Sequence, residues 1–216
     1  NNATDVFVRD LMTGAVRRVS TTALGVQGNG ISDQPAISAD GRFVASQSLA
    51  SNLVAGDSNN MRDVFVTDLS SGSIVRVTEP ASGSQPTANF DMAPSLSADG
   101  RHVAFATFYA LLPQDVNGEA NIYVKDLQTG AFDLVSSDND DRIGDFRSSS
   151  PVISADGRHV AFVSFAYNLV PDLPVREFYL AIYVKDRQTR SMRMVSTDAA
   201  GAYGNQFSVW RPGISA

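Results

Sequence analysis

The sequence is poor in the residues that most often carry catalysis or covalent cross-links. Among its 216 residues there is no cysteine, and there are only two histidines, two lysines and one tryptophan. Without cysteine the chain cannot form disulfides, use a thiol nucleophile or bind a metal through thiolates. The lack of cysteine agrees with an extracytoplasmic location (periplasmic, cell-surface or secreted), which we expect for this chain, although many cytosolic proteins share this feature.

Long apolar stretches are missing as well. No run approaches the ~18 apolar residues of a membrane-spanning helix, so we expect no transmembrane segment. The chain opens with "NNATDVFV", without a signal peptide or an initiating Met, which indicates a processed, excised or partial product. A net charge of −6 and a pI near 4.8 argue against a nucleic-acid partner.

The charges that are present have an unusual balance. Aspartate provides 20 of the 23 acidic residues, while lysine provides two of the 17 basic ones. Aspartate favours turns, whereas glutamate and lysine favour helices. Because 43% of the residues are apolar, the chain is expected to be globular. The composition therefore predicts a turn-rich globular protein with few helices.

A repeat covers nearly the whole chain. Apolar triplets begin at Val6, Val64, Ile122 and Ile182, which are 58, 58 and 60 residues apart. The phrase "SADGR" occurs three times, and prolines recur at a similar spacing at Pro35, Pro94, Pro151 and Pro212. A repeat of this length is typical of propellers and solenoids.

Each repeat contains four short apolar or alternating segments separated by turn signals. In the clearest copy they span 35–38, 42–46, 63–68 and 74–78, and we refer to them as strands A, B, C and D. An Asp-Gly turn joins A to B. Four strands per repeat without helical periodicity predict an all-β propeller of four-stranded antiparallel blades. A tandem β-sandwich is the alternative, although it usually needs longer units.

The repeated phrases also carry a family likeness. The pattern P-x-[IL]-S-A-D-G-R-x-V-A-[FS], followed by [VI]-[FY]-V-x-D-L-x-[TS]-G, resembles the TolB-like or tricorn-type propeller repeat of bacteria. The fourth copy departs from it, with Arg190 in place of the final glycine. This resemblance implies a binding scaffold, and the family also includes propeller domains of peptidases and some lyases. Fold alone does not fix function.

The repeat register divides the chain into units 1–34 (partial), 35–93, 94–150, 151–211 and 212–216 (partial). This gives three complete blades and one split, incomplete blade, because the counterpart of residues 40–58 is absent from the ends. We expect a single propeller domain, or a segment of a larger propeller that the resemblance implies to have six or seven blades. A four-bladed unit with one defective blade is an alternative. So is self-association, in which a neighbouring copy supplies the missing strand.

The loops between strands B and C are rich in oxygen-bearing side chains, some at alternate positions, as calcium ligands in a tight loop would be. This pattern makes calcium the candidate cofactor, although it departs from a complete calcium-loop motif. An Asx-rich turn is the alternative, and the fourth copy favours it because the pattern is lost there. The candidate ligands are Asp57, Asn59, Asp63, Asp115, Asn117, Glu119 and Asn121.

The longest loops collect aromatic side chains and one arginine. Such residues are enriched at protein interfaces and stack on sugars, although they also plug the ends of a core. We expect the B–C and D–A loops to lie at one end of the blades and to form the functional face. The candidates for binding a protein or glycan partner are Tyr167, Phe178, Tyr179, Tyr203, Phe207, Trp210 and Arg211, with Phe165 beside them.

No nucleophile motif, zinc-protease motif or phosphate loop is present. His102 and His159 occupy equivalent positions in consecutive repeats, which predicts a packing role for both. Asp138, Asp140 and Asp141 fit a solvated turn better than the acid pair of a glycosidase. We therefore expect a non-catalytic binding scaffold. The alternatives are a propeller domain of a carbohydrate-active or peptide-cleaving enzyme with catalytic groups outside this segment, and a structural subunit of a surface assembly.

Overall fold

The computed structural model describes residues 1–79, 92–171, 180–197 and 212–215. These residues form strands, turns and bends, and no helix is found among them. Accordingly, the described part of the chain holds no helix that is long and apolar enough to cross a membrane. The all-β class predicted from the sequence is confirmed.

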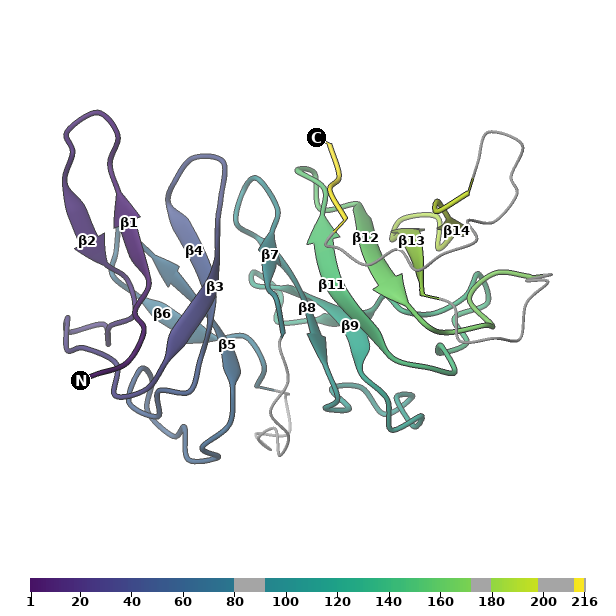
Figure 1. Ribbon diagram of the computed structural model, residues 1–216, viewed down its shortest axis with the longest axis horizontal. Coiled ribbons are helices and arrows are strands. Elements are labelled where there is room, and N and C mark those ends of the chain that lie inside the picture. The colour runs from purple at the N-terminus through teal and green to yellow at the C-terminus, as the bar shows by residue number, and fades with distance from the viewer. Residues whose placement is uncertain (80–91, 172–179, 198–211, 216) are drawn as a thin grey trace.

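The strands are grouped into one hairpin and three four-stranded antiparallel sheets, which lie side by side in chain order (Figure 1). The N-terminal hairpin consists of β1 (Phe7–Arg9) and β2 (Val16–Arg18). Blade 1 contains β3 (Ser32–Ile37), β4 (Phe43–Ser48), β5 (Asp63–Asp68) and β6 (Ile74–Arg76). Blade 2 contains β7 (Ser95–Leu96), β8 (His102–Thr107), β9 (Asn121–Asp126) and β10 (Phe132–Leu134). Blade 3 contains β11 (Ser148–Ile153), β12 (His159–Ser164), β13 (Ala181–Asp186) and β14 (Met192–Met194).

Within each sheet the strands follow the order A, B, C, D expected for a propeller blade. Because neighbouring strands are antiparallel, the A–B and C–D hairpins lie at one end of a blade and the B–C and D–A loops at the other. In Figure 1 the β1–β2 and β3–β4 hairpins point upward at the first of these ends. The structure has an open arrangement of blades rather than a closed ring, as expected for an incomplete propeller. Residues 212–215, expected to start a further strand A, form no strand.

The repeated "SADG" phrase builds the A–B hairpin. In blade 1 the Ser38 hydroxyl donates to Asp40 over 2.6 Å, and the same carboxylate accepts the backbone N–H of Arg42 over 2.9 Å. Gly41 adopts a left-handed φ of 71°, which glycine tolerates best. The alanine of the phrase connects the blades, because Ala39 N–H donates to Ala98 O over 3.0 Å and Ala98 N–H to Ala155 O over 2.9 Å.

A bidentate arginine–aspartate pair ties strand B to strand C in every blade. Arg42 donates to both oxygens of Asp68, over 3.0 and 2.8 Å. The other blades repeat this pair with Arg101–Asp126 and Arg158–Asp186. Charge-assisted, two-point hydrogen bonds of this kind favour the ionised carboxylate. They hold the pKa of each of the three aspartates well below its usual range.

The recurrent prolines mark a bulge in strand A. The residue before the proline has a left-handed backbone in all three blades, with φ of 51° at Gln34, 40° at Ala93 and 54° at Ser150. The pairing register shifts at this point in blades 1 and 3. Proline is tolerated in a strand at such a bulge because a ladder hydrogen bond is lost there anyway. Strands β3 and β11 consequently begin three residues ahead of the unit boundaries set by Pro35 and Pro151.

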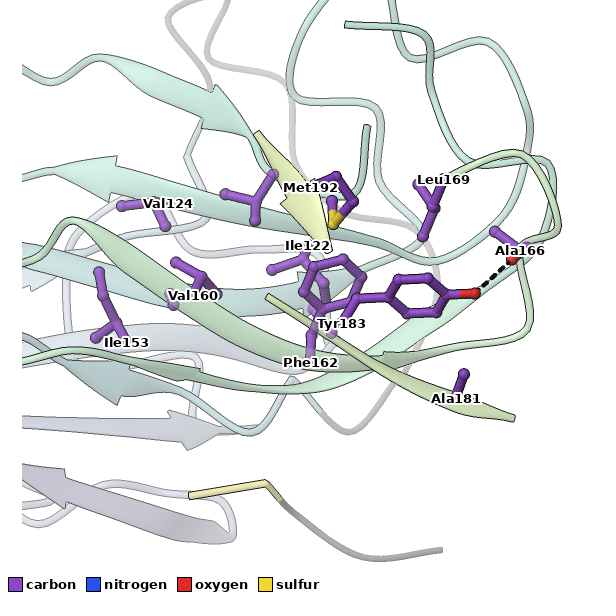
Figure 2. Close-up of a cluster of buried hydrophobic side chains, with 13 residues drawn as sticks. Ile122, Val124, Ile153, Val160, Phe162, Ala166, Leu169, Ala181, Tyr183 and Met192 are labelled. Carbon is purple, nitrogen blue, oxygen red and sulfur yellow. Dashed lines mark hydrogen bonds between the residues drawn. The ribbon is translucent and has the colours of Figure 1, made fainter. Parts of the chain in front are cut away.

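The two largest hydrophobic cores lie between blades, and a smaller cluster of Ala50, Leu53 and Phe65 lies within blade 1. Figure 2 shows the core between blades 2 and 3, where Ile122 and Val124 of β9 meet Phe162 of β12 and Tyr183 of β13, all at most 1% exposed. The Tyr183 hydroxyl donates to Ala166 O over 3.2 Å. A similar core joins blade 1 to blade 2. Burial of these side chains, at about 25 cal/mol per Å² of apolar surface, makes the contact between blades a source of stability.

Both lysines of the chain clamp one blade to the blade before it. Lys125 Nζ donates to the carbonyls of Val77 and Glu79, over 2.9 and 3.2 Å. Lys185 Nζ donates to the carbonyls of Ser137 and Asp138, over 3.0 and 2.6 Å. Neither ammonium group forms an ion pair with a carboxylate of the described residues. Burial lowers the pKa of both lysines, that of Lys185 to about 8.

Arg190 takes the place of the glycine that closes the C–D turn in the other repeats. Its φ is 64°, close to the 76° of Gly130, so an arginine occupies a backbone conformation that favours glycine. Its guanidinium contacts the preceding blade, through Asp133 over 2.7 Å and Asp141 over 2.5 Å. The ion pairs between blades therefore offset local backbone strain.

This balance can be tested at the turn. Arg190→Gly should lower the free energy of unfolding in the native chain, because two ion pairs are lost. In an Asp133→Ala/Asp141→Ala background, Arg190→Gly should raise the free energy of unfolding by about 1 kcal/mol. The ion pairs are already absent there, so the substitution removes only the strain of the left-handed backbone. Gly130→Arg is the matched control and should be destabilising, since Val75 stands at the position of Asp133 in the preceding blade. Urea unfolding measures all variants, and a stabilising Arg190→Gly in the native chain would contradict the prediction.

The lysine clamp makes a prediction about pH. The pKa of Lys185 is about 8 in the folded chain and 10.5 at its ordinary value. The unfolded chain therefore binds more protons between these values, and the contribution of this site to the free energy of unfolding rises with pH across that window. Relative to Lys185→Met, the native chain should gain stability from about pH 7.5 to about pH 10 in urea melts. The same pH dependence in the native chain and in Lys185→Met would exclude the lowered pKa of Lys185.

Candidate functional site

The end of the blades that carries the B–C and D–A loops holds a small pocket between blades 2 and 3. Its lining residues are Glu119 of the B–C loop of blade 2, Phe146 and Arg147 of the D–A loop, and Phe165 of the B–C loop of blade 3. The pocket has a volume of about 220 Å³. The Arg147 guanidinium lies 4.8 Å from the centre of the Phe165 ring, a cation–π contact. An aromatic wall thus stands beside one charge of each sign.

The predicted binding residue Tyr167 lies next to this pocket and extends its aromatic wall. Its ring meets Phe146 edge to face, with centroids 5.5 Å apart and an angle of 85° between the planes. Its backbone N–H donates to Asp145 over 2.7 Å. Tyr167 is therefore held in place by the D–A loop that supplies Phe146 and Arg147. The remaining binding-face candidates, Phe178, Tyr179, Tyr203, Phe207, Trp210 and Arg211, lie outside the described residues.

The two loops that form the pocket are joined by a set of side-chain hydrogen bonds. The Asp145 N–H donates to Asn168 over 3.0 Å, and Asn168 Nδ2 donates to Ile143 O over 2.8 Å. Blade 1 has the same arrangement, in which Asn52 accepts from Asn29 N–H over 2.9 Å and donates to Gln27 O over 3.0 Å. The backbone support is thus a property of the repeat.

The side chains mounted on this common support differ completely between the two copies. The four positions of the pocket wall carry small or aliphatic residues next to blade 1 and aromatic or basic residues next to blade 3. The matched pairs are Gly30 with Phe146, Ile31 with Arg147, Leu49 with Phe165, and Ser51 with Tyr167. Since blade 1 builds the same support without them, the aromatic and basic side chains are not needed for the fold of the loops. Residues that vary on a constant scaffold are the usual carriers of binding.

The first calcium candidate loop already contains its own cation. Arg76 lies 3.5 Å from Asp57 and 3.2 Å from Glu79, and it is buried with only 5% exposed. Asn59 donates to Asp63 over 3.0 Å, and the hydroxyl of Thr78 donates to the other oxygen of the same carboxylate. Burial raises the pKa of Asp57 and of Asp63, and their mutual repulsion raises that of Asp57 further. An internal arginine thus supplies positive charge in this loop.

In the second calcium candidate loop, the side-chain amide of Asn121 lies at the centre of a hydrogen-bond network. Asn121, fully buried, donates through Nδ2 to Asp115 over 3.1 Å and to Asn117 over 3.0 Å, and it accepts from the Ser136 hydroxyl over 2.9 Å. The Tyr123 hydroxyl donates to the remaining oxygen of Asp115. The Glu119 side chain instead lines the pocket described above.

Across the described ranges no three His, Cys, Asp or Glu side chains converge in a geometry that could hold a metal ion. Calcium binding, in which asparagine and backbone oxygens also take part, stays a prediction.

The histidine and aspartate residues considered for catalysis make structural contacts. His102 lies against Gly157, where an added Cβ would approach its ring within 2.7 Å, which fits a packing role. Asp138 accepts the N–H groups of Asp140 and Arg142, both over 2.8 Å, within its own turn.

The role of Arg76 was missed at the level of sequence, although the repeats contain the signal. Strand C begins with Asp5, Asp63, Asn121 and Ala181 in the successive copies, and strand D carries Arg18, Arg76, Leu134 and Met194. An acid thus occurs only in the copies that also have the arginine. Arg18 pairs with Asp5 at 3.4 Å, whereas Arg76 pairs with Asp57 at 3.5 Å and acts on Asp63 through its nearby charge.

Comparison with known proteins identifies the fold. TolB from Acinetobacter baumannii is 20% identical to this chain and superposes with a TM-score of 0.53, covering 88% of this chain and 37% of TolB. A protein described as TolB from Agrobacterium tumefaciens is 17% identical, with a TM-score of 0.50 over 84% of this chain and 53% of its own. The β-propeller domain of the Trilobed protease from Pyrococcus furiosus is 14% identical, with a TM-score of 0.47 over 76% of this chain and 41% of its own.

The likeness to the two TolB structures shows a TolB-like β-propeller fold, as the repeat pattern predicted. The chain spans about a third to a half of the length of the two TolB structures. A scan of the sequence against models of protein families and a search of curated proteins give no match.

The buried arginine provides a test of the loop chemistry. Arg76→Met leaves Asp57 and Asp63 buried without a cation, and removing one partner of a buried ion pair costs about 3 kcal/mol or more. Because Asp57 and Asp63 have raised pKa values in the folded chain, they take up protons as the pH falls. The stability lost in Arg76→Met should therefore be smaller at about pH 4.5 than at about pH 7. Urea unfolding at both pH values measures it.

Arg18→Met is the matched control in the N-terminal hairpin. The Arg18 side chain is 36% exposed, so this variant should lose less than about 1 kcal/mol. Equal losses from the two variants, or a loss from Arg76→Met that does not depend on pH, would contradict the role of Arg76 as the internal cation.

Proposed function

We propose that this chain is a non-catalytic binding module that recognises its partner at the B–C/D–A end of the blades. The observation that carries the proposal is the pocket formed by Glu119, Phe146, Arg147 and Phe165, with Tyr167 beside it. Its aromatic and charged side chains replace the small and aliphatic residues that the same support carries next to blade 1.

The chemistry of the pocket indicates what it can hold. A volume of about 220 Å³ accommodates one side chain of a protein or one sugar ring. Aromatic faces contribute large contact area at low conformational cost, and arginine adds directional hydrogen-bond donors. Aromatic residues with arginine dominate the energetics of protein interfaces. A protein or a glycan is therefore the class of partner, and an exposed segment that inserts one ring or side chain fits the dimensions.

The support around the pocket favours recognition without rearrangement. Phe165 N–H donates to Arg147 O over 3.1 Å, so the two residues in cation–π contact are also joined through the backbone. The hydrogen bonds of Asn168 fix the same two loops to each other. A preorganised site loses less conformational entropy on binding. We further propose an extracytoplasmic location, supported by the absence of cysteine and by the likeness to TolB.

A graft of the residues from blade 1 tests the pocket. The variant Arg147→Ile/Phe165→Leu/Tyr167→Ser places on the blade 3 support the side chains that blade 1 carries at the same positions. We expect it to keep the melting temperature of the native chain within a few degrees and to lose binding about tenfold or more, as for interface hot spots. Binding is measured with the labelled chain on arrays of peptides and of glycans, which also distinguishes the two classes of partner.

The matched control is Leu49→Ala, which alters the equivalent wall position next to blade 1. It should leave array binding unchanged. Binding that survives the triple graft, or that Leu49→Ala removes instead, would place the recognition surface elsewhere and overturn the proposal.

A further inference from the structure

A second hollow lies on the same pair of loops as the pocket described above. It has a volume of about 290 Å³, and its lining includes Asp138, Asn139, Asp140 and Arg142 of the D–A loop and Asn168 and Leu169 of the B–C loop of blade 3. We refer to these six residues as the polar pocket, and to Glu119, Phe146, Arg147, Phe165 and Tyr167 as the aromatic pocket. Since Asn168 follows Tyr167 directly, the two pockets are built on adjacent residues.

The turn that forms the polar pocket does not need a carboxylate. Oδ1 of Asp138 accepts the N–H groups of Asp140 and Arg142, both over 2.8 Å. In the equivalent loop before blade 1, the hydroxyl of Thr22 accepts the N–H groups two and four residues further on, over 3.2 and 3.1 Å. One side-chain oxygen thus suffices for this backbone. Oδ2 of Asp138 is therefore available to a ligand, with Arg142 Nη1 3.8 Å away.

The exposed tip of the turn differs in chemistry between the two copies. In both, a backbone N–H at the start of the turn donates to the carbonyl four residues further on, over 2.8 and 2.9 Å. Leu24 and Val26 stand at the tip before blade 1, 93% and 57% exposed, where Asp140 and Arg142 stand before blade 3. The polar side chains are therefore additions to a turn that folds without them.

The polar pocket presents hydrogen-bond donors beside acceptors. Arg142 Nη2 lies 3.4 Å from Asp140 Oδ2, which is longer than an ordinary hydrogen bond, so both groups can still bond to a ligand. Asn139 accepts the Met192 N–H through Oδ1 over 2.7 Å, and its Nδ2 donates to no other described residue. Neighbouring hydroxyls of a sugar can donate to the carboxylates and accept from these N–H groups at the same time.

The charges of the two pockets favour a neutral ligand. Arg142 already places a cation beside Asp138 and Asp140, so a cationic side chain of a peptide would compete with it. An anionic ligand would be repelled by the same two carboxylates. Glu119 and Arg147 likewise give the aromatic pocket one charge of each sign. A neutral ligand rich in hydroxyl groups avoids both penalties.

From this chemistry we propose that the two pockets together bind a neutral oligosaccharide. One sugar ring stacks on the aromatic pocket, and hydroxyls of a neighbouring ring bind in the polar pocket. Blade 3 holds the polar pocket in place, because Lys185 donates to Asp138 O over 2.6 Å and the Met192 N–H to Asn139. The inference rests on the proposed function and narrows its partner from a protein or a glycan to a glycan.

The experiment titrates the chain by calorimetry with the neutral oligosaccharide that binds best on a glycan array. The variant Asp140→Leu/Arg142→Val carries the tip residues of the loop before blade 1. It should keep the melting temperature within a few degrees and bind about tenfold or more weakly, because the hydrogen bonds to hydroxyls are lost. The Kd of the native chain should change less than about twofold between low and high salt, since the ligand is uncharged. Leu24→Ser/Val26→Ser is the matched control at the equivalent turn and should leave binding unchanged.

The outcomes separate this inference from the proposed function. Oligosaccharide binding that survives Asp140→Leu/Arg142→Val but is lost in Arg147→Ile/Phe165→Leu/Tyr167→Ser would refute the polar pocket and leave the proposed function standing. Binding of peptides alone, or no neutral oligosaccharide with a Kd below about 1 mM, would refute the glycan as partner. Oligosaccharide binding that survives both variants would refute both proposals.

Discussion

The carboxylate at the end of strand C organises each blade. Asp68 accepts two hydrogen bonds from Arg42 at the start of strand B, and it also accepts the Ser70 N–H in the C–D turn, over 2.9 Å. One side chain thus fixes the register of the central strand pair and closes the adjacent turn. In the N-terminal hairpin, where the structure shows strands C and D alone, Asp10 performs only the second task through the N–H groups of Met12 and Thr13. The complete pair is therefore a property of a complete blade.

Contacts between blades are less uniform than those within them. Apolar cores are common to the interfaces, but the polar contacts differ: Arg17 reaches a backbone carbonyl, Val75 offers no charge, and Asp133 engages Arg187. The two buried lysines add donors at two successive interfaces. Each interface thus has its own polar pairing on a shared apolar base, which makes the order of the blades specific even though their backbones are alike.

Much of the fold was predictable because its signals are local and repeated. Strand C was expected at 63–68 and is found there as β5, since alternation and flanking turns define it. Strand A begins earlier than expected, because the bulge at Gln34 lets pairing continue to Ser32 and Ser48, whose hydroxyls bond over 2.8 Å. A bulge interrupts the period of two that sequence reasoning relies on. The internal cation Arg76 was missed for a different reason, since its partner Asp57 lies 19 residues away and belongs to a loop without periodicity.

The pocket was predictable only in part, and the reason bears on how such a protein acquires function. Tyr167 and Phe165 stand in an aromatic loop, but Phe146 and Arg147 lie in a stretch that reads as polar turn, and only the fold brings the two loops together. The informative comparison is between repeats at the same position. Residues that the backbone requires, such as Asn52 and Asn168, are kept from blade to blade, while Ser51 becomes Tyr167 on the same support. A repeat protein can thus change its recognition surface one side chain at a time, because the hydrogen bonds that hold each loop do not depend on the side chains that face the solvent.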